Sequence, residues 1–416
     1  MKRILLSLVF LIVPLLLNAD FDPYQVTPDH TASMQELIWH ATLKKAVASD
    51  SAVDVYKALQ TCPTRDFKKA AQPHLLHAAI NRRRNTLSAL LVAGVSPNMM
   101  YSGQKLIHYV IQQGDLETAK ILVNAKADFS GNVAGNQDAF TYTSTHFNKP
   151  VPNKDTQIYL DLMYAMIKQG YDLKANFSNK DISNNAWYWA IRNADEVTVR
   201  FFRGRNSSYS LPVVADPNQV FVCQDGSTWT PVFMAIQHLH LPSHDNRGLR
   251  ISSFNSLLGL IGTCGEINLN QRAKPNGKEQ TPISYLLETY PKLEVGIGRI
   301  VETLMRYGQT AAADGIELFI KNGGDPNALF SDDGDNPGCQ PRIGRQVRRR
   351  VYFTLLGLAI MYNDIKAVKI LISAKADLNQ LTDNYLYHVN GITPYGPLAL
   401  ASGSIADLLV EHGSFR

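Results

Sequence analysis

The chain is short of the features that most enzymes and nucleic-acid-binding proteins carry. Charged residues make up only 19% of its 416 residues, and the formal net charge is +5. A charge this small disfavours a nucleic-acid partner, because such proteins neutralise many phosphates with clustered Lys and Arg. The sequence contains no nucleophile elbow, phosphate-binding loop, metalloprotease helix or dinucleotide-binding glycine motif. We therefore expect neither an enzyme nor a bound cofactor.

Long hydrophobic runs are absent after residue 19, whereas a membrane span needs about 20 consecutive apolar residues. Residues 1–19 combine a basic start, an apolar run over residues 4–17 and a small last residue, Ala19. This order is typical of a secretory signal peptide that is cut after Ala19, and the alternative is an uncleaved anchor. Cleavage removes Lys2 and Arg3, which leaves 39 basic against 36 acidic side chains and a net charge of +3.

One stretch of the sequence occurs twice. Residues 115–129 (DLETAKILVNAKADF) and residues 364–378 (DIKAVKILISAKADL) are offset by 249 positions. Eight positions are identical, including the aspartates at both ends, Asp115/Asp364 and Asp128/Asp377. Internal similarity of this kind is the sequence signature of a repeat protein.

Each copy of this stretch is the second half of a longer unit. Apolar segments at 105–110 and 354–360 precede the copies and predict a short first helix, followed by a turn. This helix–turn–helix plan resembles the ankyrin repeat, a unit of about 33 residues with a Thr-Pro-Leu-His motif at its first helix. Leu106-Ile107-His108 stands where Pro-Leu-His belongs. The resemblance implies an all-α, ankyrin-type helix–turn–helix solenoid in which His77 and His108 hold turns.

The same pattern extends along most of the chain. Residues 20–72 are interpreted as a leader and a helical capping unit, and residues 73–416 as a solenoid of about eight or nine degenerate units. Two second-helix candidates, 300–305 and 316–320, follow the Thr-Pro pair at 281–282, and the sequence does not choose between them. Polar insertions are predicted as loops near 130–155, 204–220, 238–250 and 329–350.

The four cysteines permit disulfides in an exported protein, and four cysteines allow three pairings. Cys223 and Cys264 flank one repeat and are the preferred pair. Cys62 lies in the capping unit and Cys339 in a distant insertion, which argues against joining them. No C-x-x-C motif is present, so the sequence indicates neither redox chemistry nor a zinc knuckle.

Two clusters of side chains are candidate sites. His238, His240 and His244 suit a transition metal, but no partner ligands accompany them at fixed spacing, so we favour a solvated loop and expect no metal site. A second cluster falls in the predicted insertion near 329–350 and is the candidate partner-binding site for an acidic protein or anionic surface; it consists of Arg345, Arg348, Arg349 and Arg350. A solvated basic loop is the alternative.

Stacked helix pairs leave an extended surface that suits binding. We therefore expect an exported, monomeric protein–protein interaction module, periplasmic or secreted, whose partner the sequence does not identify. One alternative is an immunity-type inhibitor that neutralises a toxic enzyme in the cell envelope. Another is a secreted effector that binds a host protein. The alternative from a different class is a metal-binding or hydrolytic protein that uses the insertions.

Overall fold

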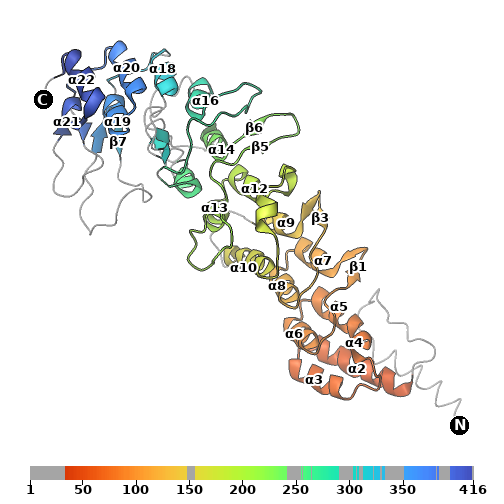
Figure 1. Cartoon of the computed structure of the whole chain (residues 1–416). Helices are drawn as coiled ribbons and strands as arrows, with labels where there is room; N and C mark the ends of the chain where they lie inside the picture. The colour runs from red at the N-terminus through yellow and green to blue at the C-terminus, as the bar shows by residue number, and fades with distance from the viewer. Residues whose placement is uncertain are drawn as a thin grey trace, which may run out of the picture. The chain divides into compact units, whose positions relative to one another are not determined.

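The computed structural model is rich in helices, and the sheets among its described residues are short and two-stranded (Figure 1). It describes residues 33–147, 155–240, 254, 256–263, 265–289, 303–305, 307–308, 313–321, 323–327, 330–332, 351–380, 382–383 and 394–414. The chain divides into two compact units, unit 1 ending at Tyr171 and unit 2 beginning at Asp172. None of the described helices is long and apolar enough to cross a bilayer.

Unit 1 is built from helix pairs joined by short antiparallel hairpins. Its helices are α2 (Met34–Ala48), α3 (Ala52–Gln60), α4 (Phe67–Ala70), α5 (Gln72–Ile80), α6 (Arg84–Val92), α7 (Leu106–Gln112), α8 (Leu116–Asn124), α9 (Ala139–His146) and α10 (Asp155–Lys168). Its hairpins are β1 (Met100–Tyr101) with β2 (Gln104–Lys105) and β3 (Asn132–Ala134) with β4 (Gln137–Asp138). The first helices α2, α5, α7 and α9 pack in that order, and so do the second helices α3, α6, α8 and α10.

Unit 2 alternates helices and hairpins in the same way. Its helices are α11 (Leu173–Phe177), α12 (Ala186–Arg192), α13 (Glu196–Phe202), α14 (Pro231–Gln237), α16 (Pro282–Thr289), α18 (Ala313–Lys321), α19 (Leu355–Met361), α20 (Ile365–Ser373), α21 (Pro397–Leu400) and α22 (Gly403–Glu411), with 3-10 turns η1 (Ile182–Asn184) and η2 (His238–His240). Its hairpins are β5 (Phe221–Val222) with β6 (Thr228–Trp229), β7 (Phe330–Asp332) with β8 (Val351–Phe353), and β9 (Thr382–Asp383) with β10 (Pro394–Tyr395).

Helix α18 contains one of the two second-helix candidates, 316–320. It packs on α16 and on α20, which makes it the second helix that follows α16. Of the other candidate, 300–305, the structure describes only residues 303–305.

The repeated sequence stretch marks the start and stop of a helix. Asp115 and Asp364 are the N-caps of α8 and α20, and each carboxylate accepts a bond from the backbone N–H three residues later, at 3.4 and 3.0 Å. Lys126 and Lys375 follow the same two helices with φ angles of 64° and 63°. That left-handed conformation ends a helix.

Residues 130–155 were predicted as one long loop, and this prediction is wrong for residues 132–146, which form the hairpin β3–β4 and helix α9. Threonine is a weak helix former. In α9 the hydroxyls of Thr143 and Ser144 donate to carbonyls of the preceding turn, at 2.7 and 2.9 Å, and Phe140 is fully buried. Burial therefore outweighs local propensity in this segment.

The predicted loops near 238–250 and 329–350 are described only in part, and the loop prediction is wrong for His238–His240, a 3-10 turn, and for Phe330–Asp332, strand β7. Residues 204–220 contain neither helix nor strand, as predicted. The stretches 241–253 and 333–350 lie outside the described residues, as does the predicted signal peptide, residues 1–19.

Candidate functional site

Four of the first helices have an aromatic residue at the same position, whereas α5, α14 and α19 have Leu75, Met234 and Leu358 there. The fourth residue of the helix is Tyr109 in α7, Tyr142 in α9, Trp189 in α12 and Tyr285 in α16. Tyr109, Tyr142 and Trp189 are half-buried and Tyr285 is buried, so these rings are anchored in the fold. We call Tyr109 and Tyr142 the aromatic row of unit 1, and Trp189 and Tyr285 the aromatic row of unit 2. Rigid aromatic side chains of this kind are enriched at protein interfaces.

A hairpin residue holds the seventh residue of the same helices in unit 1. The Gln104 side-chain amide donates to Gln112 Oε1 at 3.0 Å, and the Thr145 hydroxyl donates to Gln137 Oε1 at 3.2 Å. In unit 2, Gln280 donates to the Glu288 carboxylate in the same relation. Each glutamine lies eight residues before its partner, so one contact ties the hairpin to the helix that follows it.

Further contacts orient the aromatic row of unit 1. The rings of Tyr101 and Tyr109 meet edge to face with centroids 4.6 Å apart, and Tyr142 stacks on His146 at 3.8 Å. His108, next to Tyr109, bonds through Nε2 to the Phe129 carbonyl at 3.2 Å. Burial lowers the pKa of His108, although this carbonyl opposes the shift. His108 is therefore occupied in holding the stretch after α8.

In unit 2, side chains of three successive first helices touch one another. Arg192 of α12 donates to Gln237 of α14, and Gln237 hydrogen-bonds to the Tyr285 hydroxyl of α16. Burial raises the pKa of Tyr285, and the bonds to Gln237 and Thr289 oppose that shift. Arg192 is exposed at the end of this chain of contacts.

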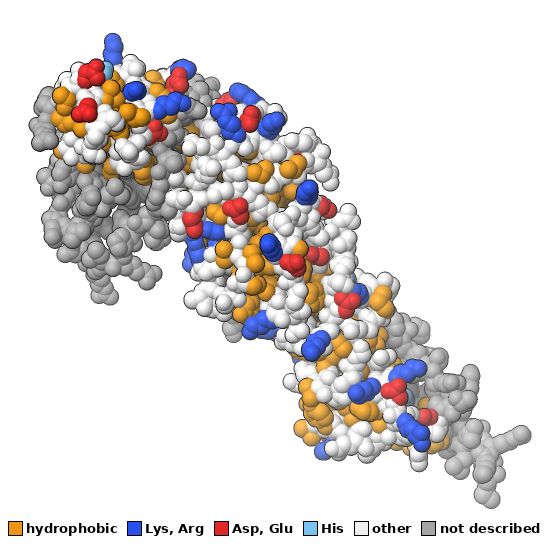
Figure 2. All heavy atoms as spheres, viewed as in Figure 1, with side chains coloured by type: hydrophobic (Ala, Val, Ile, Leu, Met, Phe, Trp, Pro, Cys, Tyr) orange, Lys and Arg blue, Asp and Glu red, His pale blue; other side chains and the backbone are white. Residues whose placement is uncertain are grey.

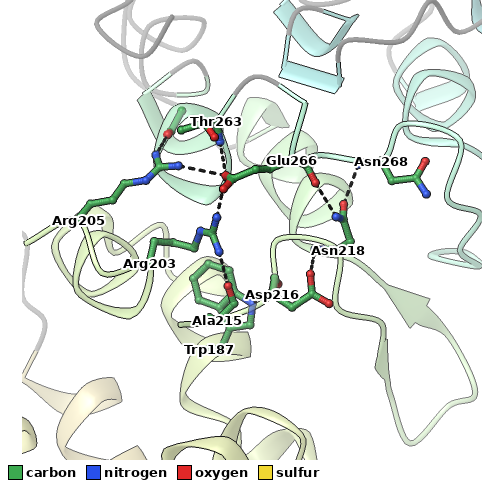
Figure 3. A network of polar contacts seen from close by, with 10 residues as sticks. Trp187, Arg203, Arg205, Ala215, Asp216, Asn218, Thr263, Glu266 and Asn268 are labelled. Atoms are coloured by element: carbon green, nitrogen blue, oxygen red, sulfur yellow. Dashed lines mark hydrogen bonds and ion pairs between the residues drawn. The ribbon is translucent and has the colours of Figure 1, made fainter. Parts of the chain in front are cut away.

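A second polar network in unit 2 joins the loop after α13 to the turn after residue 261 (Figure 3). Glu266 Oε2 accepts from Arg203 at 2.8 Å, from Arg205 at 3.4 Å and from the Thr263 backbone N–H at 2.5 Å. The Arg203 side chain is only 7% exposed and also donates to the Ala215 carbonyl. Burial opposes ionisation of Glu266, but the bonds from Thr263 and the charge of Arg203 hold its pKa below the usual range. Because every contact is internal, this network positions the loop.

The basic turn Arg82-Arg83-Arg84 is engaged in ion pairs. Arg84 donates to Asp115 Oδ1 at 2.8 Å and also contacts Glu117, and Arg82 lies 3.8 Å from Asp115. The Asp115 side chain is 4% exposed. These arginines therefore join successive helix pairs.

The candidate partner-binding arginines, Arg345, Arg348, Arg349 and Arg350, lie outside the described residues, so their role stays a prediction. On the face in view in Figure 2, Lys and Arg side chains are interspersed with Asp and Glu.

The predicted disulfide also stays a prediction. Cys223 is a half-buried free thiol beside Tyr188, whereas Cys264 and Cys339 lie outside the described residues. Burial raises the pKa of Tyr188, and the neighbouring Cys223 adds to the shift.

Of the histidine cluster, the structure describes His238 and His240. His238 Nε2 bonds to the Ile191 carbonyl at 2.8 Å, and burial lowers its pKa. His244 lies outside the described residues. Within the described part of the chain, no group of three His, Cys, Asp or Glu side chains is arranged to hold a metal ion.

Sequence reasoning missed the aromatic row and its glutamine partners. Their signal is a spacing counted from the glutamine: an aromatic residue follows it by five positions and a polar residue by eight, as in Gln104, Tyr109 and Gln112. The spacing is hard to notice because the hairpins that supply the glutamines have strands of only two or three residues.

Comparison with protein-family models finds none that matches the chain, and comparison with curated proteins finds no similar sequence.

Proposed function

We propose that this chain is an exported, ankyrin-type helical solenoid that acts as a protein–protein interaction module. Binding takes place on the side of each unit formed by the first helices and the hairpins. The observation that carries the proposal is the half-buried aromatic at the fourth position of α7, α9 and α12, which in α7 and α9 lies beside a polar residue fixed by a hairpin glutamine.

Two features of the chain support a repeat module. In unit 1 each helix pair packs on the pair before it, which is how repeats bury a continuous core. The order helix, turn, helix and hairpin recurs in both units and agrees with the ankyrin-like motifs in the sequence. The basic and apolar start of the sequence supports export.

The proposal is tested by affinity capture from an envelope extract of the producing cell, with mass spectrometry at low and at moderate salt. The wild-type protein is compared with Tyr109→Ala/Trp189→Ala and with the matched control Val92→Ala/Val410→Ala. Both control residues are exposed on second helices, at 77% and 57%.

We expect one dominant protein that survives moderate salt and is captured by the wild type and the control, and that the aromatic double variant loses. Circular dichroism shows that each variant is folded. Capture of no protein, or equal capture by all three, contradicts the proposal.

A further inference from the structure

Three of the first helices of unit 1, α5, α7 and α9, contain no charged residue, whereas α2 contains Glu36, Lys44 and Lys45. We call helices α5, α7 and α9 with the two hairpins of unit 1 the unit 1 face. The three helices, Gln72–Ile80, Leu106–Gln112 and Ala139–His146, contain no Lys, Arg, Asp or Glu. The second helices hold the charges instead, including the Lys120–Asp161 ion pair of α8 and α10 at 2.6 Å.

The hairpins of the unit 1 face contain two charged residues, and each is engaged within the protein. Lys105 bonds to Asp128 at 2.6 Å and to both oxygens of Ser130 at 2.8 and 2.9 Å. Asp138 accepts from the Thr141 backbone N–H at 2.7 Å and from the Tyr171 hydroxyl at 2.6 Å. A charged side chain of a partner placed on the helices of this face loses hydration without gaining a counter-charge, which is costly.

The groups that the unit 1 face does present suit a polypeptide. Met100, which precedes Tyr101 on β1, is 63% exposed and offers polarisable apolar surface that adapts to side chains of different shape. Gln112 accepts from Gln104 and donates to the Val133 carbonyl at 2.8 Å. A primary amide has two N–H donors and an oxygen with two lone pairs, so both glutamines retain hydrogen-bonding capacity for a peptide group.

The spacing of the helices indicates which conformation of a polypeptide matches the unit 1 face. Packed helices lie about 8–10 Å apart, which matches about three residues of an extended chain at roughly 3.3 Å each. An extended polypeptide of about seven to ten residues is therefore long enough to cross α5, α7 and α9.

We propose that the unit 1 face binds an extended polypeptide segment that is rich in apolar residues and low in charge. This inference rests on the proposed function and names its partner class. Depletion of charge with enrichment of aromatics is the pattern of the buried centre of protein interfaces. Binding at this face is accordingly independent of salt.

The test is selection of a phage-displayed library of random 12-residue peptides on the purified protein. Peptides that are enriched are synthesised, and their affinity is measured by fluorescence anisotropy in 50 and 500 mM NaCl. The variants are Tyr109→Ala, Tyr109→Lys and the matched controls Val92→Ala and Val92→Lys, with circular dichroism as the check of folding.

We expect enriched peptides with at most one charged residue and an affinity that changes less than twofold between the two salt concentrations. Tyr109→Ala weakens binding at least tenfold, Tyr109→Lys weakens it further, and both Val92 variants bind like the wild type. Enrichment of acidic or basic peptides, an affinity that falls with salt, no enrichment, or no effect of the Tyr109 variants overturns the inference.

Failure here is distinguishable from failure of the proposed function. If affinity capture yields a dominant partner while the peptides do not depend on Tyr109, the chain is a binding module whose partner is of another class or is bound elsewhere. If capture also yields no partner, the binding function itself fails.

Discussion

The side chain of Asn218 joins two turns of unit 2 through the backbone of Asn268. Asn218 Oδ1 accepts from the Asn268 N–H at 2.7 Å, and Asn218 Nδ2 donates to the Glu266 carbonyl at 2.6 Å (Figure 3). Asn327 makes the equivalent bond to the Asp377 N–H at 2.6 Å, also at a separation of 50 residues. In unit 1, Asn98 accepts from the Asp128 N–H at 2.7 Å. One asparagine therefore links the turns that follow successive second helices at three places in the chain.

Replacing Asn218 or Asn327 with alanine removes this link. We expect each variant to lose about 1–2 kcal/mol of unfolding free energy, because a backbone N–H loses its partner. Urea denaturation followed by circular dichroism measures the loss. Asn270→Ala is the control, since Asn270 is an exposed neighbour in the same turn, and it should change stability by less than about 0.5 kcal/mol. Equal effects at positions 218 and 270 would show that the link contributes nothing.

These asparagines illustrate what the sequence can and cannot predict. The helix pairs around Leu90, Leu122 and Leu371 were predicted because apolar residues recur at helical spacing, and the helices are present. Turns after the second helices were predicted from Gly, Asp and Asn. The bonds between these turns were not predictable, because 30 or 50 residues separate the partners. Helix α9 was missed because its threonines read as loop residues, and its burial depends on neighbouring helices.

The Arg84–Asp115 ion pair is expected to stabilise unit 1. Arg84→Ala leaves a buried carboxylate with only the more distant Arg82 as counter-charge. We expect Arg84→Ala to lower the unfolding free energy by about 2 kcal/mol. This is less than for a fully buried ion pair, because Arg84 is partly exposed. Arg83→Ala is the matched control in the same turn, since Arg83 is exposed, and it should be nearly neutral. Thermal unfolding compares the two, and a larger effect at position 83 would contradict a structural role for Arg84.

The Glu266 network should make unit 2 sensitive to acid. The pKa of Glu266 is lowered in the folded protein. Glu266 therefore stabilises the folded state above the unfolded pKa of about 4.5, and this stabilisation is lost as the pH falls below that value. Glu266→Gln should lower the unfolding free energy by about 1–2 kcal/mol at pH 7. Burial of Arg203 makes the loss of its counter-charge costly, and the 42% exposure of Glu266 limits the effect.

The control for this variant is Glu317→Gln, which removes an exposed pair with Lys321 on α18 and should cost no more than about 0.5 kcal/mol. Denaturant titrations at pH 7 and pH 4 separate the two outcomes. Equal stability of Glu266→Gln and the wild type at pH 7 is the result that rejects the network as a stabilising element.

His74 predicts a second acid effect, in unit 1. Its Nε2 lies 2.9 Å from His40 Nδ1, and burial together with the neighbouring His40, His77 and Lys44 lowers its pKa to about 3. Glu36 raises the pKa of His40, but burial outweighs it and the pKa of His40 is also lowered. The unfolded chain binds a proton at His74 near pH 6.5 and the folded chain does not, so stability is complete above pH 6.5 and falls as the pH drops below it.

We expect His74 to lower the unfolding free energy by an amount on the order of 2 kcal/mol between pH 7 and pH 5. His74→Gln removes the titrating group and should flatten the dependence of unfolding free energy on pH in this range. His146→Gln, at an exposed histidine of the same unit, should retain the wild-type slope. If His74→Gln and the wild type have the same slope, the buried histidine pair is not its source.

Site-specific photo-crosslinking in the producing cell tests most directly whether the first-helix side binds a partner. A photoreactive phenylalanine analogue replaces Gln112 in unit 1 or Arg192 in unit 2, and in separate control proteins it replaces Val92 or Val410 on second helices. The account predicts that irradiation gives one discrete protein adduct of the same identity from positions 112 and 192 and none from positions 92 and 410. Adducts only from positions 92 and 410, or no adduct from any position, would contradict it.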